Sequence, residues 1–187
     1  MHTVANNPTE MHRLKTRIAE VYARRERLKR DMETGALAPR IGFVELNETD
    51  RLLSDLDSRF KSLWDAARAA AQWAHGTSFE PAHLDCVAAI MLKILDGKCK
   101  MGETEKTALA AVYDTVKTRP GLHLGDDVHA LIAQARQGSD PALAEPIHAW
   151  RVRAESLIPK PVMKGFKQTL RAALSPSDPD PQEDSDA

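Results

Sequence analysis

Two long stretches near the start of the chain repeat apolar residues at spacings of three and four, and this periodicity constrains the fold more than any other feature. In the first stretch, the repeating positions are Met11, Leu14, Ile18, Val21, Arg25, Leu28 and Met32. In the second, they are Leu53, Leu56, Phe60, Leu63, Ala67, Ala70 and Ala74. A repeat of this kind places apolar side chains on one face of an α-helix, which must pack against another element. The sequence therefore predicts two long amphipathic helices.

The first of these helices is predicted to run from about Thr9 to just before Gly35. Thr9 has the hydroxyl of a favourable N-cap, and Gly35 can take the left-handed conformation that often follows a helix. Pro39 is predicted to keep the residues after it out of a helix. The apolar segment 41–46 is therefore expected to lie as a loop on the body of the protein.

The second helix is predicted to begin at Asn47 and to end at Gly76. Asn47 and Asp50, three residues apart, together resemble a capping box. A connection of about a dozen residues between the two helices favours an antiparallel hairpin. In that arrangement we expect Lys29 to lie near Asp50.

Arg25 interrupts the apolar repeat of the first helix. A guanidinium at such a position costs desolvation unless a carboxylate meets it, and the antiparallel register predicts Asp57 as that partner. Two alternatives stay open. The side chain can extend past the edge of the seam into water, or it can set the register of a dimer.

Five shorter helices are predicted after Gly76, with Pro, Gly and acidic residues at their ends. The predicted ranges are about 81–97, 103–118, 126–137, 141–157 and 162–174. The predicted fold class is all-α, with a long N-terminal antiparallel helical hairpin over residues 9–76 and a compact bundle of shorter helices over 77–174. Residues 175–187 are acidic and rich in proline, which predicts a disordered tail.

Cysteine content and hydropathy predict a cytoplasmic protein that does not contact membranes. The two cysteines, Cys86 and Cys99, are too few for a disulfide framework. No secretory signal follows Met1, and the longest apolar run, residues 87–95, is broken by Lys93 and too short to span a bilayer. The frequent Ala and Arg indicate a bacterial source with a GC-rich genome.

The best candidate metal ligands do not have the spacing of a structural zinc site. His83 and Cys86 share one helix face, with His75 upstream and Cys99 downstream, but such sites usually have a tight pair at each end. Cys86 also lies within an apolar helix, where a buried thiol is the usual explanation. We therefore predict no metal and no cofactor.

One segment bears on enzymatic activity. Residues 78–95, SFEPAHLDCVAAIMLKIL, resemble helices of all-α nucleotide pyrophosphohydrolases of the MazG kind. That resemblance implies magnesium held between an E-x-x-E and an E-x-x-D pair. Glu45 and Glu48 have the first spacing, but no E-x-x-D follows at a suitable distance. A metal-dependent nucleotide hydrolase is therefore the second alternative function.

The best acid–base cluster is formed by His123 and His129 beside Asp126 and Asp127. The two aspartates are also the residues expected at the start of a helix, where they cap its amides and complement its dipole. No phosphate-binding loop, nucleophile elbow or H-E-x-x-H motif is present in the sequence. We therefore predict no catalytic residues.

Two basic segments make nucleic-acid binding the first alternative, although the net charge of −1 gives no overall attraction. The candidate phosphate contacts are Arg13, Arg27, Arg30, Lys160, Lys164, Lys167 and Arg171. The opposing explanation is that acidic residues of the second helix pair with the first segment and the acidic tail folds back on the second.

The leading hypothesis is a non-enzymatic protein-interaction module, because a long amphipathic hairpin offers more apolar surface than a small bundle can cover. The candidate partner-binding residues are Arg17, Tyr22, Arg24, Arg25, Trp64 and Trp73. The expected partner is another protein or a second copy of the chain. Phage- or plasmid-encoded accessory and regulatory proteins fit this role.

Overall fold

The computed structural model describes residues 10–119, 124–138 and 140–174, and these residues form seven α-helices and a short 3-10 turn, with no strand. In chain order the elements are α1 Glu10–Glu33, α2 Pro39–Gly76, α3 Pro81–Leu95, α4 Glu103–Val116, α5 Asp126–Gln137, η1 Pro141–Leu143, α6 Ala144–Leu157 and α7 Lys160–Leu174. The all-α class is confirmed. Thr9, His123 and the predicted tail 175–187 lie outside the described residues.

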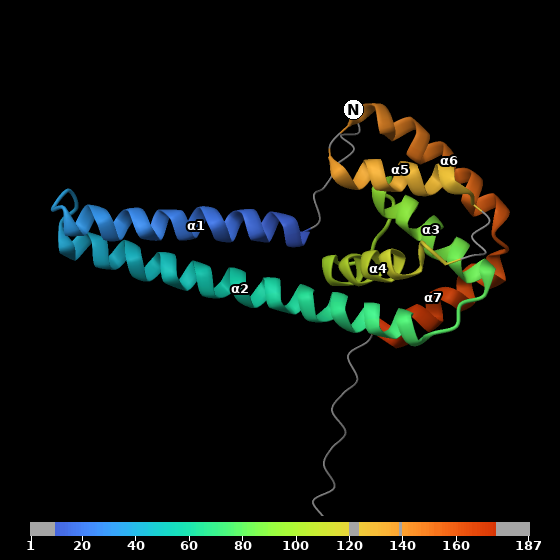
Figure 1. Cartoon of the computed structure of the whole chain (residues 1–187), viewed down its shortest axis with the longest axis horizontal. Coiled ribbons are helices and arrows are strands. Elements are labelled where there is room, and N and C mark those ends of the chain that lie inside the picture. Colours follow the sequence, from blue (N-terminus) through green and yellow to red (C-terminus); the bar gives the residue numbers. More distant parts are fainter. Residues whose placement is uncertain (1–9, 120–123, 139, 175–187) are drawn as a thin grey trace, which may run out of the picture.

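The predicted helical hairpin is confirmed. α1 lies antiparallel along the N-terminal part of α2, and the pair projects from the other helices as an arm (Figure 1). α1 buries Leu14, Val21 and Leu28, which are seven residues apart and face α2. Elsewhere α1 is largely exposed. The arm is thus held together by one narrow apolar seam.

The predicted start of the second helix is wrong, because α2 begins at Pro39 and not at Asn47. Proline is well tolerated at the first helical position, where its missing N–H would have no partner within the helix. Gly42 lies against Met32, whose side chain occupies the space that a side-chain carbon at position 42 would fill. Residues 41–46 are therefore helical, and Phe43 and Val44 are exposed instead of covering the body.

The early start of α2 also corrects the predicted ion pairs. Nε of Arg25 donates to Oδ1 of Asp50 at 2.5 Å, so the expected pairing with Asp57 is wrong. Lys29 pairs with Glu26 at 3.3 Å instead of with Asp50. Because the hairpin turn is shorter than predicted, α2 is displaced along α1 by about one heptad.

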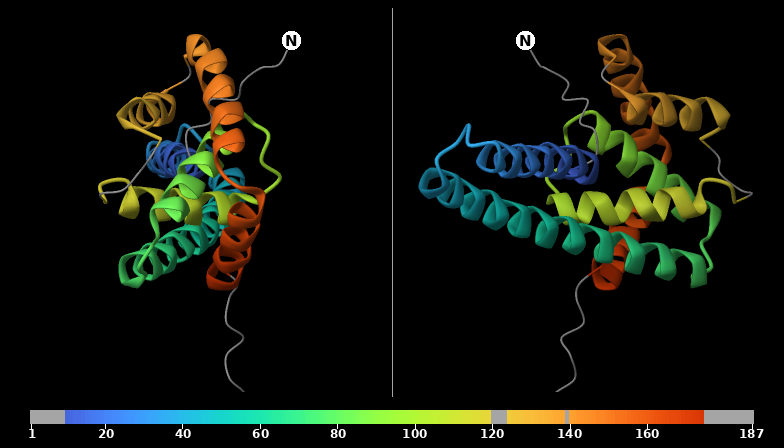
Figure 2. Two further views of the ribbon diagram at one scale, coloured as in Figure 1. Left: turned by 90° about the vertical axis from the view of Figure 1, so that its right-hand side faces the viewer. Right: turned by 60° about the vertical axis from the view of Figure 1, so that its left-hand side comes forward.

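The helices α3–α7 and the C-terminal part of α2 form the rest of the molecule, which we call the body. Its core is built around α3, whose residues from Leu84 to Leu92 are all buried. α4, α5, α6 and α7 pack around it. The C-terminal part of α2 lies along α4 and contributes Ala70 and Ala74 to the same core (Figure 2). Arg119, just after α4, donates to the carbonyl oxygen of Thr77 at 2.8 Å. Because α2 packs against α1 in the arm and against α4 in the body, this one continuous helix joins the two parts.

Candidate functional site

Large exposed apolar side chains gather on the two helices of the arm. Those on α1 and α2 are Tyr22, Ile41, Phe43, Val44, Leu52 and Trp64, and those on α6 are Val152 and Leu157. Large apolar side chains are usually buried, so a concentration of exposed ones on projecting helices indicates a contact surface. The arm is accordingly the candidate site.

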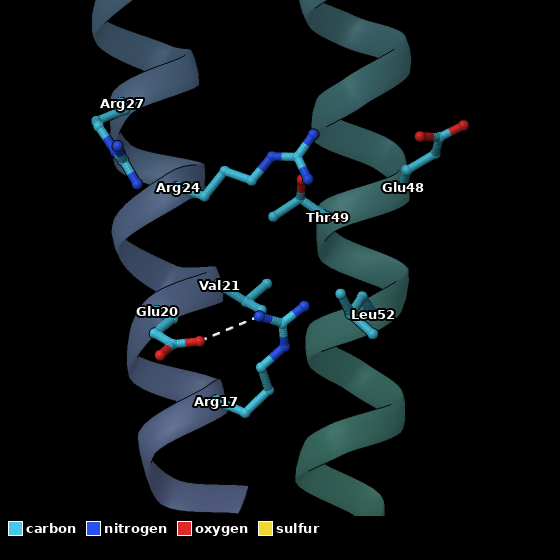
Figure 3. A pocket seen from close by; sticks show the side chains of 8 residues that line it. All are labelled: Arg17, Glu20, Val21, Arg24, Arg27, Glu48, Thr49 and Leu52. Atoms are coloured by element: carbon cyan, nitrogen blue, oxygen red, sulfur yellow. Dashed lines mark hydrogen bonds and ion pairs between the residues drawn. The ribbon is translucent and has the colours of Figure 1, made fainter.

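A groove rich in arginine runs along one side of the arm, and we call it the basic groove. It has a volume of about 450 Å³ and is lined by Arg17, Glu20, Val21, Arg24, Arg27, Glu48, Thr49 and Leu52. Arg17 and Arg24 reach from α1 toward α2, whereas Glu48 points away from the groove (Figure 3).

Ion pairs hold the arginines of the basic groove in place. Arg17 pairs with Glu20 at 3.0 Å, and Arg24 pairs with Glu45 of α2 at 3.3 Å. These groups are largely exposed, and such pairs contribute little to stability. The lining of the groove contains three arginines and two glutamates, so its rim is mainly positive. Val21 and Leu52 form the apolar floor below this rim.

A second groove, the apolar groove, lies between α1 and α2 on the other side of the arm. Its volume is about 480 Å³, and its lining residues are Lys15, Ile18, Ala19, Tyr22, Ala23, Asp57 and Phe60. The two grooves face different ways because Tyr22 and Arg24, two residues apart, are about 200° apart around a helix axis. Nζ of Lys15 lies 5.7 Å from the centre of the Phe60 ring.

The structure distributes the predicted partner-binding residues over several environments. Arg17 and Arg24 line the basic groove, and Tyr22 lines the apolar groove. Trp64 is exposed on α2. Arg25 is half-buried against Asp50, whose hydrogen bond raises the pKa of the guanidinium.

Trp73 belongs to a different part of the molecule from the other candidates. Its ring packs edge-on against Phe79, with the ring centres 5.4 Å apart, beside the core of the body. The same apolar periodicity carries Trp64 and Trp73, so the sequence alone did not separate the exposed ring from the packed one.

The predicted nucleic-acid contacts fall into two groups on different helices. Arg13, Arg27 and Arg30 are exposed on α1, where Arg13 pairs with Glu10 at 3.6 Å. The other four, Lys160, Lys164, Lys167 and Arg171, lie on α7. Figure 1 places α1 and α7 in separate parts of the molecule, so the two groups do not form one continuous surface.

A basic cavity at the α7 surface was missed by the sequence analysis, and we call it the lysine pocket. Its volume is about 330 Å³, and Lys98 and Lys100 join Lys167 and Arg171 of α7 there. Lys93 also lines it and pairs with Glu155 at 3.3 Å. The sequence shows two neighbouring lysines in Lys98–Cys99–Lys100, which indicates local positive charge. Only the fold places this segment beside α7.

Of the predicted acid–base cluster, His123 lies outside the described residues. Nδ1 of His129 lies 2.7 Å from the Tyr113 hydroxyl, and Asp126 at the start of α5 acts on the ring through its charge. Burial lowers the pKa of His129 and raises the pKa of Tyr113 to about 12. Arg136 stacks over the Tyr113 ring and pairs with Asp114 at 2.7 Å. Both His129 and Tyr113 are therefore neutral near pH 7 and serve to pack α5 on α4.

The described residues contain no group of three His, Cys, Asp or Glu side chains that could hold a metal ion. Glu45 is paired with Arg24, and Glu48 points away from the arm's groove. Cys86 is fully buried, and burial raises the pKa of its thiol to about 11. The part of the chain that the structure describes thus offers no magnesium site of the kind that the pyrophosphohydrolase resemblance implies.

None of the helices in the described ranges is both long and apolar enough to cross a bilayer. Compared with protein-family models, curated proteins and solved structures, the chain matches none significantly.

Proposed function

We propose that this protein is a non-enzymatic interaction module of the bacterial cytoplasm, and that its α1–α2 arm binds a helical segment of a protein. The observation that carries the proposal is the gathering of exposed large apolar side chains on the projecting arm. A protein that works by binding another protein fits an accessory or regulatory role, of the kind that phages and plasmids encode.

The shape of the apolar groove supports a helical partner. A third helix laid between α1 and α2 would place an apolar ridge over Ile18, Tyr22 and Phe60, as helices do when ridges pack into grooves. Lys15 and Asp57 flank this surface and would select partners with complementary charge.

Affinity capture from the source bacterium, with nuclease treatment throughout, tests the proposal. Tyr22→Asp should abolish retention of the partner, because it places a charge in the apolar groove. The matched control is Val152→Asp on α6, where the native side chain is 48% exposed compared with 56% for Tyr22. Equal retention by both variants, or a partner that nuclease removes, would contradict the proposal.

Nucleic-acid binding is a second candidate, favoured by the lysine pocket. α7 carries four basic residues and no acidic one, and its Lys167 lies beside Lys98 and Lys100. Such a surface can follow a phosphate backbone, with affinity that falls steeply as salt rises.

Gel-shift titrations at low and moderate salt test this second candidate. Lys167→Glu should weaken binding at low salt, whereas Arg51→Glu, on the exposed outer face of α2, should not. No retardation of DNA or RNA by the wild-type chain at low salt would remove it.

A further inference from the structure

We infer that the partner of the apolar groove is a second copy of this chain, with the two α1 helices antiparallel and related by a two-fold axis. The inference rests on the proposed function and specifies its partner. It follows from a self-complementary stripe on the side of α1 that borders the apolar groove.

The stripe consists of Lys15, Ala19, Tyr22 and Glu26, at spacings of four, three and four residues. The first three line the apolar groove, and Glu26 follows Tyr22 by one helical turn. This spacing is that of a coiled-coil seam, distinct from the seam of Leu14, Val21 and Leu28 that α2 covers. α1 therefore has two apolar stripes: α2 covers the first, and only the edge of the second, through Asp57 and Phe60.

The stripe is complementary to itself only when the two helices are antiparallel. A two-fold axis between Glu20 and Val21 places Lys15 of one copy opposite Glu26 of the other, and Tyr22 opposite Ala19. Each contact then occurs twice, as in any isologous interface. A parallel pairing would instead place lysine against lysine and glutamate against glutamate, which is repulsive.

Side-chain size supports the same register. Tyr22 is 56% exposed, and Ala19 and Ala23 leave space in the groove beside it. In the antiparallel pairing each tyrosine ring packs over the alanines of the other copy, a large side chain against small ones. Aromatic side chains held in this way are frequent centres of protein interfaces.

The charges that flank the tyrosines can reach this pairing: Glu26 pairs with Arg25 at 3.2 Å and with Lys29 at 3.3 Å through the same oxygen, Oε1, and its side chain is 40% exposed. Hydrogen bonding to Lys29 lowers the pKa of Glu26, so its carboxylate is ionised at neutral pH. The Lys15 ammonium lies over the Phe60 ring, and the described residues give it no ion pair. Lys15 lines the groove and Glu26 is partly exposed one turn beyond it, so pairing of the two costs little desolvation.

The centre of the stripe coincides with the centre of α1. The helix spans Glu10–Glu33, 24 residues or about 36 Å, and the proposed axis passes within about one residue of its midpoint. The two arms would thus overlap along nearly all of α1. An overlap of this length is what a stable pair of helices requires.

Sedimentation velocity on the full-length chain tests the inference with a charge exchange. Lys15→Glu and Glu26→Lys should each weaken self-association about tenfold or more, because either change makes both ion pairs repulsive. An equimolar mixture of the two variants should associate as tightly as the wild type. In that mixture, the substituted carboxylate of one variant faces the substituted ammonium of the other, and native Glu26 faces native Lys15.

Arg27→Glu is the matched control, since it reverses an exposed charge of α1 on the side of the basic groove. It should leave the dimer intact. A wild-type chain that is monomeric up to roughly 100 µM, or variants whose association mixing does not restore, would overturn the inference. The proposed function would survive that result if Tyr22→Asp still abolished capture of a different protein, so the two failures are distinguishable.

Discussion

Val21→Ala should open the arm without unfolding the body. Val21 is 4% exposed at the middle of the narrow seam that joins α1 to α2. α1 packs mainly against α2, whereas α3 is surrounded by other helices on several sides. Losing contacts in the seam should therefore raise the population of molecules in which only the arm is open, as expected of a unit with few buried contacts.

The size of the effect follows from the two methyl groups that the substitution removes. Their transfer from water is worth about 1.6 kcal/mol at ~0.8 kcal/mol per group. Unfilled volume adds a further cost, which is small here because Val21 borders the basic groove and the site can relax. A total of about 2 kcal/mol corresponds to a loss of protection of about 30-fold.

Hydrogen exchange monitored by mass spectrometry measures this loss peptide by peptide. Peptides from α1 and the facing part of α2 should exchange about 30-fold faster, and peptides from α3 should be unchanged. Val128→Ala is the matched control, because Val128 is fully buried in the body and its loss should accelerate exchange in α3. Equal acceleration of arm and body by Val21→Ala would refute the reasoning, because it would mean that they unfold together.

Three further predictions concern the register, the thiols and the response to pH. Asp50→Ala should lower the thermal unfolding midpoint more than Asp57→Ala, because Asp50 pairs with the half-buried guanidinium of Arg25. A larger loss for Asp57→Ala would mean that Arg25 pairs with Asp57, as the sequence alone predicted. At pH 8 a disulfide reagent should label Cys99 and not Cys86 until the chain is denatured, because burial raises the pKa of Cys86 to about 11; rapid labelling of both would contradict the packing of α3. The pKa of His129 is lowered, chiefly by burial, so below about pH 6.5 the unfolded chain binds more protons than the folded one. The stability that the neutral ring contributes is thus present above that pH and lost as the pH falls. In a plot of the unfolding midpoint against pH, His129→Gln should therefore reduce the fall of the midpoint on the acid side. An unchanged fall would mean that other groups cause the loss of stability in acid.

The sequence by itself determined the helices and most of their ends. The spacings of apolar residues identified every helix, and the predicted range of α5, residues 126–137, agrees with the structure. Such signals are local, since a cap or an apolar face depends on residues within one or two turns. Arg17, Tyr22 and Arg24 fall outside the apolar repeat of the first helix, and in the structure all three are exposed.

The start of α2 was decided by tertiary contact. Pro39 is compatible with a loop and with the first turn of a helix, so the residue itself does not distinguish them. In the structure, Gly42 lets Met32 of α1 lie close against α2, and this packing continues the helix through a segment that resembled a loop. Because the register depends on where α2 begins, the pairing of Arg25 with Asp50 was decided at the same point.

Only the tertiary structure decided which side chains share a surface. Lys98 and Lys167 meet in the lysine pocket although 68 residues of chain separate them, and no local pattern records such a meeting. Trp64 and Trp73 lie on the same helix, yet only Trp73 reaches the body, where it packs against Phe79. The physical reason is that periodicity specifies the face of a helix that must be buried, whereas the element that buries it depends on the packing of the whole chain.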